Sequence, residues 1–271
     1  MTTLASIFFQ IPLEALAVRM AATAFVVIAV AWAVGRFGPI IGGALAGLPI
    51  VLGPGFYFLI AQTPKAFIAQ MAAYSLYSLC ATQLFLLAYI ASARKARPWT
   101  SLACAIGAWL IAVFLLQGLP AQPVIGVLLF ALASLVCLRL GRRFILPESP
   151  SVGKAGLGLL LVRGLLAGAL VAVVTATSSR LGSVGAGLLL AFPIGFTVVA
   201  VTIHQTQGPA DVIATLYSAL RGTASLAGFC AVLAMAVPHW AAPVALGAAL
   251  ATSMSITLCL VFRRQIRACF P

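Results

Sequence analysis

Two glycine-rich stretches decide how this chain folds: GGALAGLPIVLGPG at residues 42–55 and GAGLLLAFPIG at residues 185–195. Each leads into a proline and lies inside an otherwise apolar segment. Proline removes a backbone hydrogen bond from a helix and clashes with the preceding turn, while nearby glycines let the backbone unwind or approach a neighbour. The first stretch therefore predicts a broken helix, and the second predicts at least a kink.

The composition around these stretches is that of a membrane protein. Of the 271 residues, 63% are hydrophobic and 7% are charged, and the mean hydropathy is +1.19. Apolar runs close to the roughly 20 residues that a helix needs to cross a bilayer recur from end to end, whereas a β-barrel would show short alternating segments. We therefore expect an all-α polytopic membrane protein.

The apolar runs predict about nine transmembrane helices. Their approximate bounds are residues 13–34, 40–61, 66–92, 100–117, 122–138, 156–178, 183–204, 211–236 and 241–262. The fourth and fifth are short and are joined by QGLPAQP, so they could be tilted or partly re-entrant. The N-terminal stretch lacks a basic region, and a cleaved signal peptide is not expected.

The basic residues predict how the spans are oriented. Sixteen Lys and Arg stand against three Asp and Glu, which gives a net charge of +13. Because the charges separate hydrophobic spans, they indicate topology and contact with lipid head groups rather than nucleic-acid binding. The richest clusters are Arg94, Lys95 and Arg97, then Arg139, Arg142, Arg143 and Lys154, and finally Arg263, Arg264 and Arg267. Nine spans put all three clusters on one side, which predicts an outside N-terminus and a cytoplasmic C-terminus.

An internal repeat accounts for the two similar stretches. When the chain is shifted by 144 residues, the aligned pairs include Arg19 with Arg163, Arg36 with Arg180, Gly43 with Gly187, and Pro49 with Pro193. We expect two four-helix halves, residues 1–120 and 155–271, joined by a connector helix and a basic loop at residues 121–154. The odd number of intervening spans inverts the second half, an architecture typical of secondary transporters. The alternative is a duplicated protein that merely forms a homo-oligomer.

Broken helices in paired, inverted positions predict a binding site near the middle of the bilayer. The candidate substrate-binding residues are Pro49, Gly53, Pro54, Gly55, Gln62, Tyr74, Pro193, Gly195, Gln205, Tyr217 and Arg221. Tight helix packing is the competing interpretation for the glycines and prolines. Hydrogen bonding between helices is the competing interpretation for the glutamines and tyrosines.

Ionisable residues inside the spans add further candidates. Arg221 lies within the eighth predicted span, where a charge usually faces a cavity or a partner, unless the boundary is displaced and Arg221 is interfacial. Asp211 and His204 are candidates for proton coupling. Arg19 and Arg163 are gate candidates for an anion, although arginines near span ends often reach to the interface instead. With so few carboxylates, passive or potential-driven movement of an anionic solute is expected.

No catalytic or metal-binding constellation is found. The chain lacks paired carboxylates, an HExxH motif, a Walker motif and a Ser-His-Asp set. Its six cysteines form no CxxC pair and fall mostly in apolar segments. We therefore expect no enzyme activity, no cofactor and no metal, with membrane lipids and an unidentified small molecule as partners.

One motif resembles a known family. The stretch AGLLLAFPIGF at residues 186–196, followed by a polar junction and ADVIATLYSALRG, is similar to the GlpM-like small inner-membrane proteins, whose pattern is AGL, three residues, FP and a polar turn. Those proteins are about half this length, so the chain resembles a fused, inverted pair. The first half departs from the pattern, with Leu48 at the position of Phe192. The resemblance implies residence in a bacterial inner membrane. A transporter is the function expected, and a non-transporting scaffold for an envelope polysaccharide or lipid pathway is the alternative.

Overall fold

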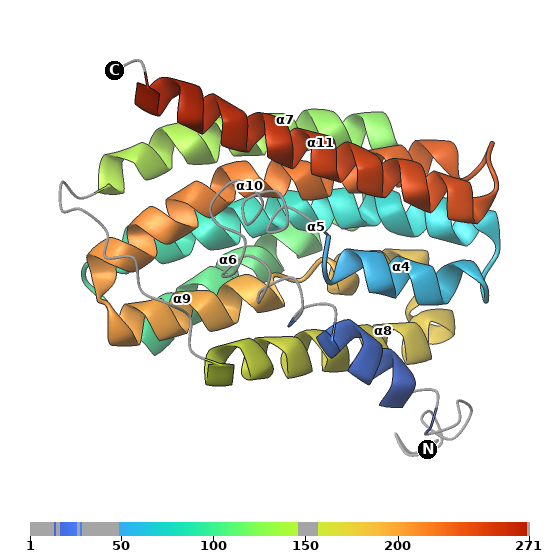
Figure 1. The fold of residues 1–271 in the computed structure, drawn as a ribbon, viewed down its shortest axis with the longest axis horizontal. Helices are drawn as coiled ribbons and strands as arrows, with labels where there is room; N and C mark the ends of the chain where they lie inside the picture. The colour runs from blue at the N-terminus through green and yellow to red at the C-terminus, as the bar shows by residue number, and fades with distance from the viewer. Residues whose placement is uncertain (1–13, 15–16, 26–27, 29–48, 146–156, 270–271) are drawn as a thin grey trace.

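The chain folds into a bundle of helices, shown in Figure 1. The computed structural model describes residues 14, 17–25, 28, 49–145 and 157–269, and this part of the chain contains helices and no strand. Residues 17–25 form a short N-terminal helical stretch. The later helices are α4 (Leu52–Ile60), α5 (Lys65–Ser92), α6 (Pro98–Leu116), α7 (Pro123–Gly141), η1 (Arg142–Phe144), α8 (Leu157–Leu190), α9 (Ile194–Thr206), α10 (Pro209–Ala236) and α11 (Ala242–Cys269).

Prolines determine where many of these helices begin. Pro98, Pro123 and Pro209 are the first residues of α6, α7 and α10. The fixed φ of proline suits a first helical turn, and the N–H that proline lacks would have no partner within the helix at that position. Pro64 and Pro193 stand immediately before α5 and α9. The chain thus restarts a helix at each of these prolines.

Helix α5 is the centre of the bundle. It packs against α6, α7, α8 and α10. Of its most apolar 18-residue stretch, 83% is buried inside the bundle. Helix α10 lies beside it and runs in the opposite direction, as Figure 1 shows. The outward faces of α6 and α7 carry exposed apolar side chains, among them Leu110, Phe114, Leu128 and Leu132. Water would disfavour such faces, whereas lipid accepts them.

The described helices confirm an all-α membrane protein. Six of them are long and apolar enough to cross a bilayer, among the residues that the structure describes. One of the six stretches, Gly164–Thr206, is longer than a single pass needs. It is interrupted at Gly182, whose φ of 64° is readily accessible only to glycine. This interruption coincides with the boundary predicted between the sixth and seventh spans.

Two further points concern the predicted spans. The fourth and fifth spans are uninterrupted helices of 19 residues, α6 and α7, and both are long and apolar enough to cross a bilayer. The first two spans, 13–34 and 40–61, fall largely outside the described residues. Of the second span, the structure describes residues 49–61 only, and these include the nine-residue helix α4.

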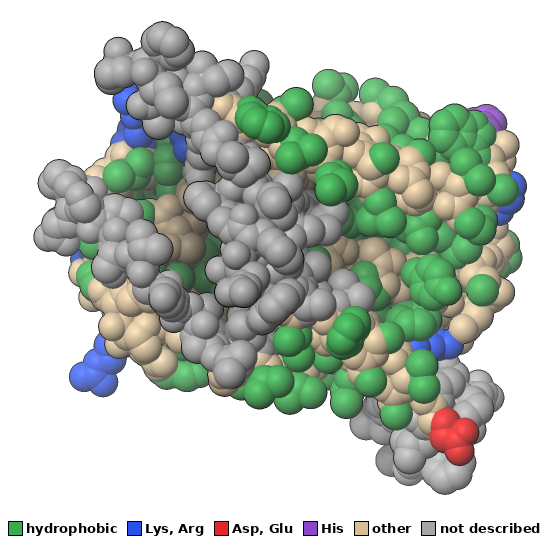
Figure 2. All heavy atoms as spheres, viewed as in Figure 1, with side chains coloured by type: hydrophobic (Ala, Val, Ile, Leu, Met, Phe, Trp, Pro, Cys, Tyr) green, Lys and Arg blue, Asp and Glu red, His purple; other side chains and the backbone are tan. Residues whose placement is uncertain are grey.

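Charges gather at the ends of the bundle. Arg94, Lys95 and Arg97 follow α5, and Arg139, Arg142 and Arg143 close α7; all six are exposed. We call this the basic end. Figure 2 shows hydrophobic side chains over much of the visible face, with Lys and Arg side chains towards the two ends. Trp99 at the basic end and Trp240 at the opposite end are both exposed, as is common for tryptophan at a membrane surface.

Candidate functional site

The second glycine-proline stretch interrupts a helix, whereas the first is described only from Pro49 onward, directly before a helix. In the second, residues 191–193 are non-helical, and Pro193 is followed directly by α9, so the kink predicted there is a full break. In the first, Pro49 is non-helical and its carbonyl accepts a hydrogen bond from the N–H of Gly53 at 2.6 Å, at the start of α4. Each proline therefore precedes a helix start, and neither start has a side-chain cap.

Helix α4, which follows Pro49, lies against the end of α8, which precedes the second break. A Cβ built on Gly55, in α4, would fall 2.5 Å from the Cδ1 atom of Leu190, the last residue of α8. Gly55 therefore allows the first half-helix to approach the end of α8. Gly53 is buried as well, but a Cβ there would meet only Leu250 at 3.9 Å. Pro54 is half-buried in the same helix.

Hydroxyl groups of α5 satisfy the backbone near the second break. Ser75 donates to the carbonyl of Gly187 at 3.0 Å, and Ser78 donates to that of Leu188 at 2.8 Å. Both carbonyls belong to the last helical turn, where regular partners run out: Gly187 still accepts from the Ala191 N–H at 3.4 Å, whereas the Phe192 N–H bonds to Leu189 instead of Leu188. Gly187 itself lies so close to the Met71 carbonyl that no side chain would fit. Protein hydroxyls therefore supply hydrogen bonds to backbone carbonyls that lipid could not supply.

An aromatic pair flanks the start of α9. The rings of Trp109 and Phe192 meet edge to face, with centroids 4.9 Å apart. Trp109 is buried, and its Nε1–H has no hydrogen-bond partner. Gly195, one residue into α9, is half-buried. The break is thus bordered by one aromatic contact and one unused donor.

A buried amide side chain lies between the two central helices, α5 and α10. The Nε2 atom of Gln83, in α5, donates to the carbonyl of Leu220 at 3.1 Å and to Thr223 Oγ1 at 2.8 Å, both in α10. Gln83 is fully buried, and its Oε1 has no hydrogen-bond partner. The amide therefore links α5 to α10 in the interior of the bundle.

Arg19 is buried rather than extended to the surface. Its Nη2 donates to Gln62 Oε1 at 2.9 Å, and its guanidinium lies 5.8 Å from the centroid of the Phe58 ring. Its Nη1 has no hydrogen-bond partner. Gln62 is exposed in the turn between α4 and α5. The structure thus joins a predicted gate residue to a predicted substrate-binding residue.

Arg221 is exposed and lies near the basic end. Its guanidinium stacks 4.9 Å from the Tyr217 ring centroid, and its Nη2 donates to Tyr217 Oη at 3.4 Å. Tyr217 in turn donates to the carbonyl of Leu138 at 3.3 Å, and Gly141 packs against its ring. Arg221 is therefore near the level of the last turn of α7. Arg221 directly follows Leu220, whose carbonyl accepts from the buried Gln83, and its depth in the membrane stays a prediction.

The remaining candidates are dispersed. Tyr74 donates to the Leu119 carbonyl at 3.1 Å, at the end opposite the basic end. Tyr74 and Tyr217 therefore each link their helix to a neighbouring segment through a hydrogen bond to a backbone carbonyl. His204 is buried, with Nδ1 3.2 Å from Tyr89 Oη. The other three are Gln205, which is exposed on α9, Asp211, which is buried in the first turn of α10, and Arg163, which lies in α8 with a side chain outside the described set.

Sequence reasoning missed four polar or aromatic residues at the bundle centre. Ser75, Ser78 and Gln83 lie on α5, and Trp109 lies on α6. The sequence signal that could have found the α5 residues is the presence of serine and glutamine side chains in the apolar stretch AAYSLYSLCATQL. Such side chains mark helix contacts in membranes. The pattern does not say which neighbour each residue meets.

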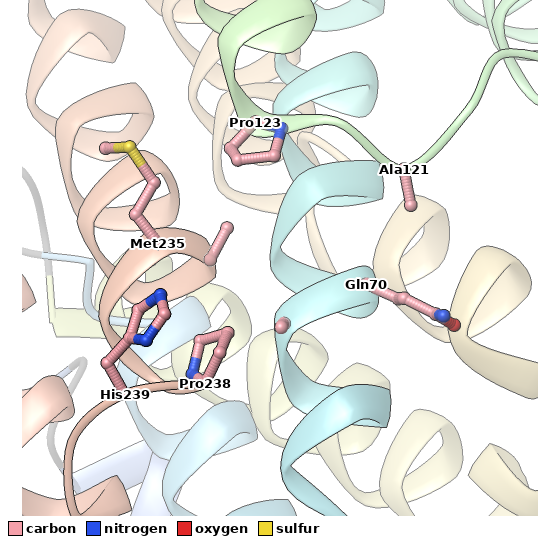
Figure 3. A pocket seen from close by; sticks show the side chains of 8 residues that line it. Gln70, Ala121, Pro123, Met235, Pro238 and His239 are labelled. Carbon is pink, nitrogen blue, oxygen red and sulfur yellow. The ribbon is translucent and has the colours of Figure 1, made fainter.

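A cavity of about 370 Å³ lies at the end opposite the basic end. Figure 3 shows that it lies between the start of α5, the start of α7 and the end of α10, with Gln70 directed away from His239 and Met235. Gln70 Oε1 accepts a hydrogen bond from Ser183 at 2.9 Å. The lining is mostly apolar, and none of the predicted site residues borders it. Among the described residues, no group of three or more potential metal ligands is found.

No family model, curated protein or solved structure matches this chain. The similarity to GlpM-like proteins therefore stays a prediction.

Proposed function

We propose that this protein is a transporter of the bacterial inner membrane that moves a small anionic solute or lipid head group. The substrate would bind between the two interrupted helices. The observation that carries the proposal is the contact between Gly55 and Leu190, which brings α4, the helix that follows Pro49, to the second break. Paired interrupted helices at one place in the membrane are typical of transporter binding sites.

The helix bounds support the proposed inverted repeat. Helices α5 and α10 have 28 residues each, and their first residues, Lys65 and Pro209, are 144 positions apart. The same interval separates Pro98 from Ala242, the first residues of α6 and α11. This interval is the shift that aligns the two halves in sequence. The proposal retains nine spans, with halves at residues 1–120 and 155–271.

The directions of the central helices support inversion. Helices α5 and α10 run oppositely, and α6 and α11 also run oppositely in Figure 1. A repeat inserted twice in the same orientation would give parallel pairs. The exposed basic end favours a cytoplasmic location for the α5–α6 turn, with the N-terminus outside.

The electrostatics favour an anion as cargo. The net charge is +13, and helix starts such as that of α9 carry a partial positive charge. Arg19 is buried, and Arg221 offers a second cation near the basic end. Asp211 and His204 remain the candidates for proton coupling.

A scaffold without transport activity is the second candidate. Ser75 and Ser78 donate hydrogen bonds to backbone carbonyls beside the second break, and Gly187 packs directly on α5. A permanently packed break would serve architecture alone. The same helices would then present the exposed faces of α6 and α7 to a partner of an envelope pathway.

Water access to the two helix starts distinguishes these functions. Gly53→Cys and Thr197→Cys place thiols in the first turns of α4 and α9, where Gly53 has room for a side chain. The background should lack the exposed Cys104 and Cys259, and also Cys269. The matched control is Leu128→Cys on the exposed apolar face of α7.

A transporter predicts that a water-soluble thiol reagent labels both test positions in native membranes but leaves the control unlabelled. Protection of both positions under all conditions would contradict the proposed site and favour the scaffold. Protection that appears only when a candidate anion is added would identify that anion as a ligand.

A further inference from the structure

The most unusual charge in the described structure is Arg19. Its side chain is 6% exposed, and one of its terminal nitrogens, Nη1, is buried without a hydrogen-bond partner. A guanidinium offers five N–H donors in a fixed planar fork and stays charged at any physiological pH. Buried arginines therefore almost always face an anion or a full set of acceptors.

Within the described part of the chain, Arg19 forms no ion pair. The two carboxylates there are Glu14, which is exposed, and Asp211, in the first turn of α10 at the basic end. Arg19 lies beside Gln62, in the turn between α4 and α5, at the other end. Its neighbours are the Gln62 amide and the Phe58 ring, and neither carries a negative charge.

The surroundings hold Arg19 in place. A Cβ on Gly168 of α8 would fall 2.5 Å from the Met20 carbonyl, so the helical stretch at residues 17–25 packs backbone to backbone against α8. Thr23 donates to the Arg19 carbonyl at 2.9 Å. The guanidinium is therefore presented by a closely packed helix and is not a freely moving surface charge.

The Gln62 side of this contact is exposed. Gln62 accepts from Arg19 through Oε1, which leaves the amide nitrogen of the same side chain as a further donor. Gln62 and its neighbour Ala61 are exposed, whereas Arg19 is buried. Donors of a guanidinium and an amide, close together at the edge of the bundle, match the oxygens of a carboxylate or phosphate.

We propose that Arg19 and Gln62 form an oxyanion-binding site at the end opposite the basic end, which takes the carboxylate or phosphate group of a solute or lipid. The inference deepens the proposed function and rests on it only for the role of this anion as cargo. Binding itself requires no transport and is tested without it.

The experiment measures thermal unfolding of the full-length protein in detergent with inorganic phosphate, succinate, or chloride at equal ionic strength. A second arm uses phosphatidylcholine nanodiscs with and without phosphatidylglycerol, because a lipid head group could supply the same oxyanion. The variants are Arg19→Met, Arg19→Lys and Gln62→Leu. Arg180→Met is the matched control, because Arg180 is an exposed arginine on α8.

Phosphate, succinate or phosphatidylglycerol should raise the unfolding midpoint of the wild type beyond the effect of chloride, because a ligand of the folded state stabilises it. Stabilisation by the free anions would identify a solute site, and stabilisation by phosphatidylglycerol alone would identify a lipid site. Arg19→Met should abolish the shift, and Arg180→Met should retain it. Arg19→Lys and Gln62→Leu should weaken binding about tenfold, the change expected from a lost charge-assisted hydrogen bond.

Without any anion, Arg19→Met should unfold at the same or a higher temperature than the wild type, because it removes an unneutralised buried charge. A purely structural arginine would instead leave the variant less stable. The inference is overturned if no anion stabilises the wild type, or if Arg19→Met keeps the full shift. Should Arg19→Met fail to fold, an unchanged shift in Gln62→Leu and Arg19→Lys would overturn it equally. Loss of this site with continued labelling at Thr197→Cys would leave the proposed function standing.

Discussion

Ser75 and Ser78 lie about one turn apart on α5, and each donates to a carbonyl of α8 shortly before that helix stops. Ser78→Ala should lower the free energy of unfolding by about 1 kcal/mol, because the Leu188 carbonyl loses its partner in an apolar interior. Ser75→Ala should cost less, because the Gly187 carbonyl keeps the Ala191 N–H. Ser255→Ala is the matched control, since the Ser255 hydroxyl bonds only within α11. Equal effects at all three positions in denaturant titrations would contradict a special role for the α5 serines.

Gln83 offers a second test at the residue scale. Gln83→Leu keeps a similar volume and removes a buried acceptor without a partner, so the free energy of unfolding should change by less than about 1 kcal/mol. Gln83→Ala leaves a cavity and should cost about 2 kcal/mol or more. Thr223 retains its hydrogen bond to the Leu220 carbonyl in both variants. A loss of unfolding free energy in Gln83→Leu as large as that in Gln83→Ala would show that the amide contacts are essential to the α5–α10 pair.

At the scale of the element, the second break depends on how closely α8 approaches α5. Gly187 meets the Met71 carbonyl directly, so Gly187→Ala should force the helices apart and cost about 1–3 kcal/mol, the usual effect of overpacking. Gly107→Ala, on α6, has open space around the new methyl group and should be neutral or stabilising by up to about 1 kcal/mol. Thermal unfolding in detergent compares the two. Similar costs at both positions would argue against close packing at the break.

At the scale of the whole molecule, the two ends of the bundle should lie on opposite sides of the membrane. Lys95 is exposed at the basic end, and Gly118 is exposed in the turn between α6 and α7 at the other end. In intact cells, an impermeant thiol reagent should label Gly118→Cys and should reach Lys95→Cys only after the membrane is broken, because basic clusters remain cytoplasmic. The reverse labelling pattern would contradict the proposed orientation, and labelling of both in intact cells would contradict helix α6 as a span.

The sequence by itself determined the class of the protein and the places where its helices start. Length and hydropathy required helices that cross a membrane, and Pro98, Pro123 and Pro209 mark helix starts because proline acts on its own backbone. Helix α5 was predicted at residues 66–92 and observed at Lys65–Ser92 for the same local reasons.

Only the tertiary structure decided which groups meet. The partnership of Arg19 with Gln62, of Ser78 with the Leu188 carbonyl, and of Gly55 with Leu190 joins residues far apart in the chain. The contacts of Arg221 with Tyr217, and of Tyr217 with the end of α7, likewise depend on how α10 packs beside α7 and not on the composition of α10. Local patterns report periodicity and backbone preference, whereas the partner of a buried polar group follows from how the helices pack.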